Sequence, residues 1–189
     1  MVGHSKTILT ISTIVFSLSF GAGYFTNSIL NFDFNSSSNL MLLNYKETLV
    51  LTAYNILTQN LKVCFLLLIG SITFGASTLQ NLVYNGYNMG YAVAKALKFG
   101  LNTSEILVLM LPHCIFEIPA IIMAGAAGFK IPYEIIRYLA GKKEQVLTKE
   151  DIKEYLTMAL ISIILIVIAA WIEANVTLKI AEEVIKSSK

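Results

Sequence analysis

The sequence has few charged residues. Asp, Glu, Lys and Arg make up 14% of its 189 residues, whereas soluble domains carry about 25%. Hydrophobic residues make up 56%, and this balance predicts a polytopic membrane protein whose length is a count of spans rather than of soluble domains. The net charge of +2 is small, so we expect no nucleic acid among its partners.

Several catalytic motifs are also missing. The sequence contains no Gly-x-Ser-x-Gly, no phosphate-binding loop and no His-Glu-x-x-His. It has two histidines, His4 and His113, and two cysteines, Cys64 and Cys114. Both cysteines lie in apolar segments, which disfavours a structural disulfide and leaves the redox compartment open.

The apolar runs predict an all-α membrane helix bundle in a single domain, 1–189, with about five spans. These spans are expected near residues 8–26, 63–84, 86–99, 105–129 and 156–176. Residues 27–62 are more polar and predict interfacial helices on the outer surface. Residues 130–155 form the densest basic region, which the positive-inside rule places in the cytoplasm together with the N-terminus. The predicted location is the cell membrane, where the lipid bilayer is one partner.

Small residues and capping residues predict how the helices pack and where they begin. Glycine and alanine recur at spacing four in two places, a pattern that lets helix backbones approach closely and makes a homo-oligomer plausible. The two ridges are Gly86, Gly90 and Ala94, and Ala120, Ala124 and Gly128. Asn102 and Thr148 each precede an acidic residue by three positions, the spacing of a capping box. The dipeptide 85–86 (Asn-Gly) predicts a tight turn between the second and third spans.

The stretch LPHCIFEIPA, residues 111–120, is unusual for a membrane span. Its two prolines predict a fourth span that is kinked or broken. A glutamate at the centre of a bilayer costs about 2.5–3.5 kcal/mol on insertion scales, so Glu117 must be paired, protonated or wet. His113 and Glu117 are four residues apart and share a helix face. Glu173, on a small-residue face of the fifth span, is the expected third member of the site.

Three interpretations of His113, Glu117 and Glu173 remain open. They form a structural polar clamp between two helices, or a site for zinc or another divalent metal, or a catalytic acid–base group or proton relay on a transport path. Adjacent helix residues point about 100° apart, which disfavours a direct pair between Cys114 and His113, whereas Cys114 and Glu117 more nearly face each other.

The motifs resemble the stage II sporulation protein M (SpoIIM) family of integral membrane proteins. The similar pieces are NLKV at 60–63, NGYNMG at 85–90, the stretch 111–120 followed by AGAAG at 124–128, and IEA at 172–174. Together they cover about residues 60–176. The family usually has glycine where this chain has Cys114.

The resemblance implies several functions. The named member of the family is a sporulation scaffold for two peptidoglycan-degrading partners, and other members occur with circular bacteriocins, where they are implicated in maturation. We therefore expect a component of peptide maturation, cyclisation or export, with a precursor peptide or other membrane proteins as partners. The alternatives are a non-catalytic scaffold for a cell-wall hydrolase complex and a small-solute or proton-coupled permease.

Overall fold

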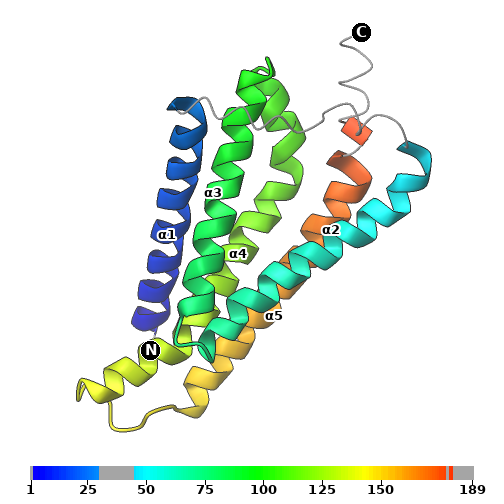
Figure 1. Ribbon diagram of the computed structural model, residues 1–189. Helices are drawn as coiled ribbons and strands as arrows, with labels where there is room; N and C mark the ends of the chain where they lie inside the picture. Colours follow the sequence, from blue (N-terminus) through cyan, green and yellow to red (C-terminus); the bar gives the residue numbers. More distant parts are fainter. Residues whose placement is uncertain (1, 30–44, 178, 181–189) are drawn as a thin grey trace.

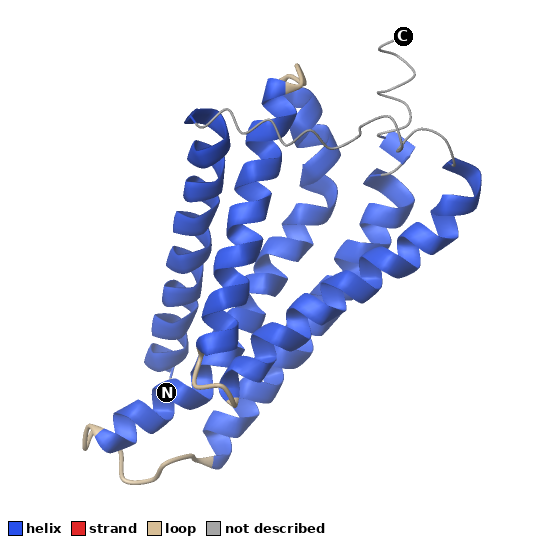
Figure 2. Ribbon diagram, viewed as in Figure 1, coloured by secondary structure: helices blue, strands red, loops and turns tan. Residues whose placement is uncertain are grey.

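A computed structural model describes residues 2–29, 45–177 and 179–180 of the chain. All regular structure within these residues is helical, as predicted (Figure 2). The elements are α1 (Val2–Ile29), α2 (Tyr45–Leu68), the short 3₁₀ turn η2 (Ile69–Ser71), α3 (Ala76–Lys98), α4 (Thr103–Leu139), α5 (Lys149–Ile172) and the π-helical turn η3 (Glu173–Thr177).

Helix α4 is the centre of the bundle, because it contacts α1, α2, α3 and α5. The two most extensive pairings are α1 with α3 and α4 with α5. The chain runs up and down through the bundle, so the N-terminus, the α2–α3 turn and the α4–α5 loop lie at one end (Figure 1). The α3–α4 turn and the end of α5 lie at the other end.

Glycines bring α1 and α3 into backbone contact. A Cβ atom added to Gly90 would lie 1.9 Å from the carbonyl oxygen of Phe20, and one on Gly23 would lie 2.0 Å from that of Tyr87. No side chain fits at these distances, so the close approach requires glycine at both positions. Gly86, Gly90 and Ala94 are all buried, which confirms the predicted packing ridge.

The α2–α3 reversal lies at residues 69–75, not at Asn85–Gly86 as the sequence predicted. Gly75 adopts a left-handed φ of 88°, which favours glycine, and its amide donates to the carbonyl of Gly70 at 2.7 Å. The predicted 63–84 span therefore contains a turn, and 85–86 lies inside α3. The Asn-Gly signal failed because Gly86 packs against α1 rather than turning the chain.

Helix α4 is one continuous helix from Thr103 to Leu139 with three prolines inside it. Pro112, Pro119 and Pro132 each remove one backbone donor, and Figure 1 shows the helix bending near its C-terminal end, in the yellow-green part. The capping boxes predicted for Asn102 and Thr148 are both formed, at the starts of α4 and α5.

Within the described part of the chain, three helical segments are long and apolar enough to cross a membrane: Ser5–Ile29, Thr103–Leu139 and Lys149–Thr177. Their outward faces carry large apolar side chains, such as Leu18 at 70% exposure and Leu160 at 60%. Apolar residues on the outside and small residues at the helix contacts are the pattern of a bundle in lipid. The chain is therefore a multi-pass helical membrane protein.

The predicted regions 27–62 and 130–155 both overlap described helices. The interfacial region 27–62 contains residues 30–44, which lie outside the described residues, and most of α2. The basic region 130–155 is largely helical, because α4 continues to Leu139 and α5 begins at Lys149. Only residues 140–148 form the connection.

Candidate functional site

His113, Cys114 and Glu117 form a compact cluster on α4. One ligand-capable atom from each side chain lies within 4.8 Å of the other two. Cys114 is buried, while His113 and Glu117 are partly buried. The helix repeat places 113 beside 117 and 114 near 117, so the predicted facing of His113 and Glu117 is confirmed. The thiol of Cys114 also belongs to the cluster, although Cys114 was not among the predicted site residues.

Thr177 holds the imidazole from the opposing helix. The Nδ1 atom of His113 and the hydroxyl of Thr177 are 3.2 Å apart, and Thr177 is buried. A hydrogen bond at Nδ1 fixes the ring and leaves Nε2 free to contact a ligand. No sequence signal marked Thr177, because its position depends on the π-helical turn that ends α5 and on how α5 packs against α4.

Glu173 stands at the beginning of the same π-helical turn and is partly buried. It is not one of the three residues within 4.8 Å of one another, but it is close enough for its charge to interact with Glu117 and Cys114. The face that leads to it, from Ala159 through Ser162, Ile166 and Ala169 to Ala170, is buried as predicted. Glu173 therefore faces the cluster from α5.

The donor set suits a divalent metal. Imidazole, thiolate and carboxylate are all zinc ligands, at about 2.0–2.3 Å from the metal. The ligand atoms of a tetrahedral zinc site lie about 3.3–3.8 Å apart by these distances, so the three side chains would move together by about 1 Å to hold an ion. Three protein ligands leave the fourth position open, which is the arrangement of catalytic rather than structural zinc.

Helix α2 presents polar atoms to the bundle interior. The Cys64 thiol and the Ser162 hydroxyl of α5 are 3.4 Å apart, in a buried contact. One turn before Cys64, the amide nitrogen of Asn60 is buried and has no hydrogen-bond partner among the described residues. A buried amide donor of this kind is available to a bound molecule or an ordered water.

A second polar group, the ion-pair cluster, lies where α4 meets the start of α5. It consists of Lys130, Glu134, Arg137, Lys143, Asp151 and Glu154. Lys130, only 2% exposed, lies 2.6 Å from Glu154, 3.2 Å from Glu134 and 3.6 Å from Asp151. Glu134, 1% exposed, lies 2.9 Å from both Arg137 and Lys143.

Three cations and three anions balance within the ion-pair cluster. Burial opposes the charge of Lys143, but its hydrogen bonds to Asp151 and Glu134 outweigh burial and hold the pKa of the lysine above its ordinary value. These residues line a cavity of about 230 Å³. Half of the basic residues that predicted a cytoplasmic loop are thus paired with buried acids. The sequence feature that could have predicted the ion-pair cluster is the pair of opposite charges, Lys130 and Glu134, four residues apart in an apolar sequence.

The fold and the cluster define the class first: a helical, multi-pass membrane protein with a polar site between two of its spans. The comparison of sequences then gives the family. Residues 10–178 match the family described as Stage II sporulation protein M, and the chain belongs to that family.

Two uncharacterised proteins of Methanocaldococcus jannaschii are similar to this chain. One is 47% identical over 176 residues, which cover 93% of this chain and 97% of that protein. The other is 34% identical over 128 residues, which cover 66% of this chain and 55% of that protein. No solved structure matches the chain.

Proposed function

We propose that this family member acts in the maturation, cyclisation or export of a peptide at the cell membrane, through a metal site made by His113, Cys114 and Glu117. The observation that carries the proposal is the clustering of three different metal-ligating side chains within 4.8 Å in a helix long and apolar enough to span a membrane. Polar groups at such a depth are costly and are usually functional.

The residues would share the work as follows. His113, Cys114 and Glu117 would hold a divalent ion, and Thr177 would orient His113 through its Nδ1 atom. Such an ion, when bound, would supply Lewis-acid chemistry for a peptide carbonyl. Glu173, on the opposing helix, is placed to accept or donate a proton during peptide-bond chemistry. In the same proposal the N-terminus and the 140–148 loop, which share one end of the bundle, are cytoplasmic.

Maturation of a co-expressed circular-bacteriocin precursor tests the role of the site. His113→Ala and Glu117→Gln are expected to abolish the mature product, followed by mass spectrometry, while both variants insert at the wild-type level. Glu144→Gln, an exposed glutamate in the α4–α5 connection, is the matched control and should leave the product unchanged. A normal yield of product from both site variants would sink the enzymatic role.

Two other functions predict different outcomes. A non-catalytic scaffold for a sporulation or cell-wall hydrolase complex is favoured by membership of the Stage II sporulation protein M family. In that case deletion within residues 30–44 would remove the activity and the site variants would keep it. A small-solute or proton-coupled permease is favoured by carboxylates on two facing helices. In that case solute or proton flux into proteoliposomes would fall in Glu117→Gln and Glu173→Gln.

A further inference from the structure

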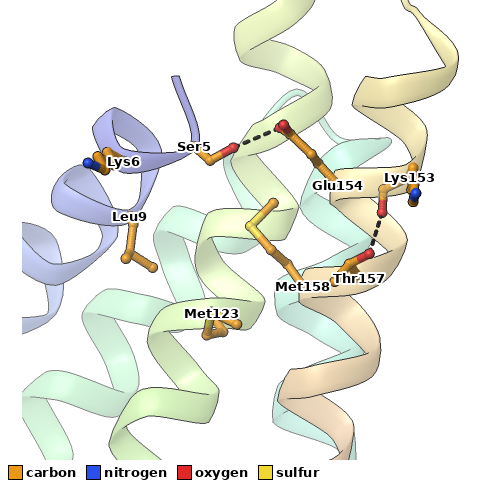
Figure 3. Close-up of a pocket in the computed structure, with 8 residues that line it drawn as sticks. All are labelled: Ser5, Lys6, Leu9, Met123, Lys153, Glu154, Thr157 and Met158. Carbon is orange, nitrogen blue, oxygen red and sulfur yellow. Dashed lines mark hydrogen bonds between the residues drawn. The ribbon is translucent and has the colours of Figure 1, made fainter. Parts of the chain in front are cut away.

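A crevice lies between α1, α4 and α5, at the end of the bundle that holds the N-terminus. It has a volume of about 430 Å³, within the range of about 300–1,000 Å³ typical of small-molecule sites. In Figure 3, Lys6 and Lys153 flank one end of the crevice from opposite sides, with Ser5 and Glu154 between them. Leu9, Thr157 and Met158 lie further along, and Met123 lies toward the other end. The crevice is thus polar at one end and apolar at the other.

The charge at its polar end is positive. Glu154 also lines the crevice, but its carboxylate lies 2.6 Å from the buried Lys130 and accepts a hydrogen bond from Ser5 at 2.7 Å. Its charge is therefore compensated inside the protein. Lys6 and Lys153 are exposed, and among the described residues neither ammonium group has an ion-pair partner. An anion at this end would meet two unpaired cations.

The dimensions match the boundary of a bilayer. Leu9 follows Lys6 by three residues and Met158 follows Lys153 by five, so the apolar part begins about 5–8 Å beyond the lysines at the helical rise of about 1.5 Å per residue. The headgroup layer of each leaflet has a similar thickness of about 5–8 Å, because a bilayer is about 40–45 Å thick and its hydrocarbon core about 30 Å. A neighbouring groove on α5 has the same arrangement, because Lys149 and Lys153 line it first and the apolar Leu156 and Leu160 follow further along the helix.

We propose that this crevice binds an anionic membrane lipid, with its phosphate at the end that Lys6 and Lys153 flank and one apolar chain against Leu9, Met123 and Met158. The bound lipid joins α1 to α5, two helices that otherwise meet here through the Ser5–Glu154 hydrogen bond. The proposal is independent of the metal site, which lies on α4 more than two helical turns before Lys130 and faces the other end of α5.

Native mass spectrometry of the full chain in detergent, titrated with phosphatidylglycerol or phosphatidylcholine, measures the headgroup preference. The wild type should bind phosphatidylglycerol more tightly. The Lys6→Gln/Lys153→Gln double variant should lose this preference by roughly 10- to 30-fold, because each lysine near an anionic surface contributes about 1 kcal/mol. Lys62→Gln/Lys142→Gln removes the same charge at exposed positions elsewhere and should keep the preference.

A crevice-filling variant separates a built site from general attraction to charge. Leu9→Trp should weaken the binding of phosphatidylglycerol with both lysines present, whereas Leu18→Trp, on the same helix and 70% exposed, should not. Equal binding of the two lipids by the wild type, or a preference that survives Lys6→Gln/Lys153→Gln, overturns the proposal. A photo-crosslinker at position 9 that yields a polypeptide adduct in membranes, rather than a lipid adduct, also overturns it.

Discussion

Replacing Lys130 by methionine tests whether the ion-pair cluster holds α4 to α5. Methionine keeps most of the length of the side chain and removes its charge. The Nζ atom of Lys130 lies within 4 Å of three carboxylates, on Glu134, Asp151 and Glu154, and Lys130 is 2% exposed. The variant therefore leaves buried negative charge without its nearest cation.

The expected loss of stability follows from what each carboxylate keeps. Removing one partner of a buried ion pair costs about 3–5 kcal/mol. Lys143 still bonds Glu134 and Asp151 in the variant, and the Glu154 side chain is 33% exposed, so water can solvate it. Because of these remaining contacts, we expect the loss of stability to lie near the lower end of this range, at about 3 kcal/mol.

Unfolding in detergent, followed by the loss of helical circular dichroism with increasing denaturant, measures this loss. Lys142→Met is the matched control, since Lys142 is exposed at the same end of the bundle, and its effect should stay within about 0.5 kcal/mol. The Lys130→Met/Glu154→Gln variant should recover part of the stability, because it removes the carboxylate that lost its closest cation. A Lys130→Met protein as stable as the control would refute a structural role for the ion-pair cluster.

Three further predictions concern packing, capping and pH. Gly90→Ala should disrupt the α1–α3 contact and destabilise the protein in the same denaturation assay, because its Cβ would lie 1.9 Å from the Phe20 carbonyl oxygen. Gly21→Ala is the control, since a Cβ at Gly21 meets nothing within 4 Å. It should be neutral or stabilising by up to about 1 kcal/mol. Thr148→Ala should lose about 1 kcal/mol of stability in that assay through the α5 cap, and Thr148→Ser should restore it. Because the pKa of Lys143 is raised, its contribution to the melting temperature should persist through neutral pH and be lost only as pH rises beyond the ordinary lysine pKa of about 10.4; Lys143→Met should reduce this alkaline loss, and an unchanged pH profile would contradict the assignment.

Local signals in the sequence predicted the helices and their caps but not all of their boundaries. The capping boxes at Asn102 and Thr148 depend on contacts three residues apart, so the sequence contains them completely. The α2–α3 turn was placed wrongly because glycine serves two purposes in this chain. Gly75 turns the backbone, whereas Gly86 lets α1 pack closely against α3. Only the packed structure distinguishes these two roles.

Some residues of the candidate site could likewise be predicted from the sequence, and others could not. His113 and Glu117 were predictable, since a spacing of four on one helix puts them together. The contribution of Thr177 was not, because it depends on a π-helical turn and on the register of α5 against α4. Lys130 and Glu134 were interpreted as part of a basic loop because the balancing acids, Asp151 and Glu154, come from the next helix.

The metal content of the purified protein tests the central claim most directly. After expression with zinc and removal of loosely bound ions, elemental analysis should find about one zinc per wild-type chain. It should find less than about a tenth of that in His113→Ala and Glu117→Gln, and the wild-type content in Glu144→Gln. Thr177→Val should keep the ion but weaken its affinity by about 10- to 100-fold, as expected for a residue that orients a ligand. A wild-type protein with His113 intact that holds no stoichiometric divalent metal would contradict the metal site.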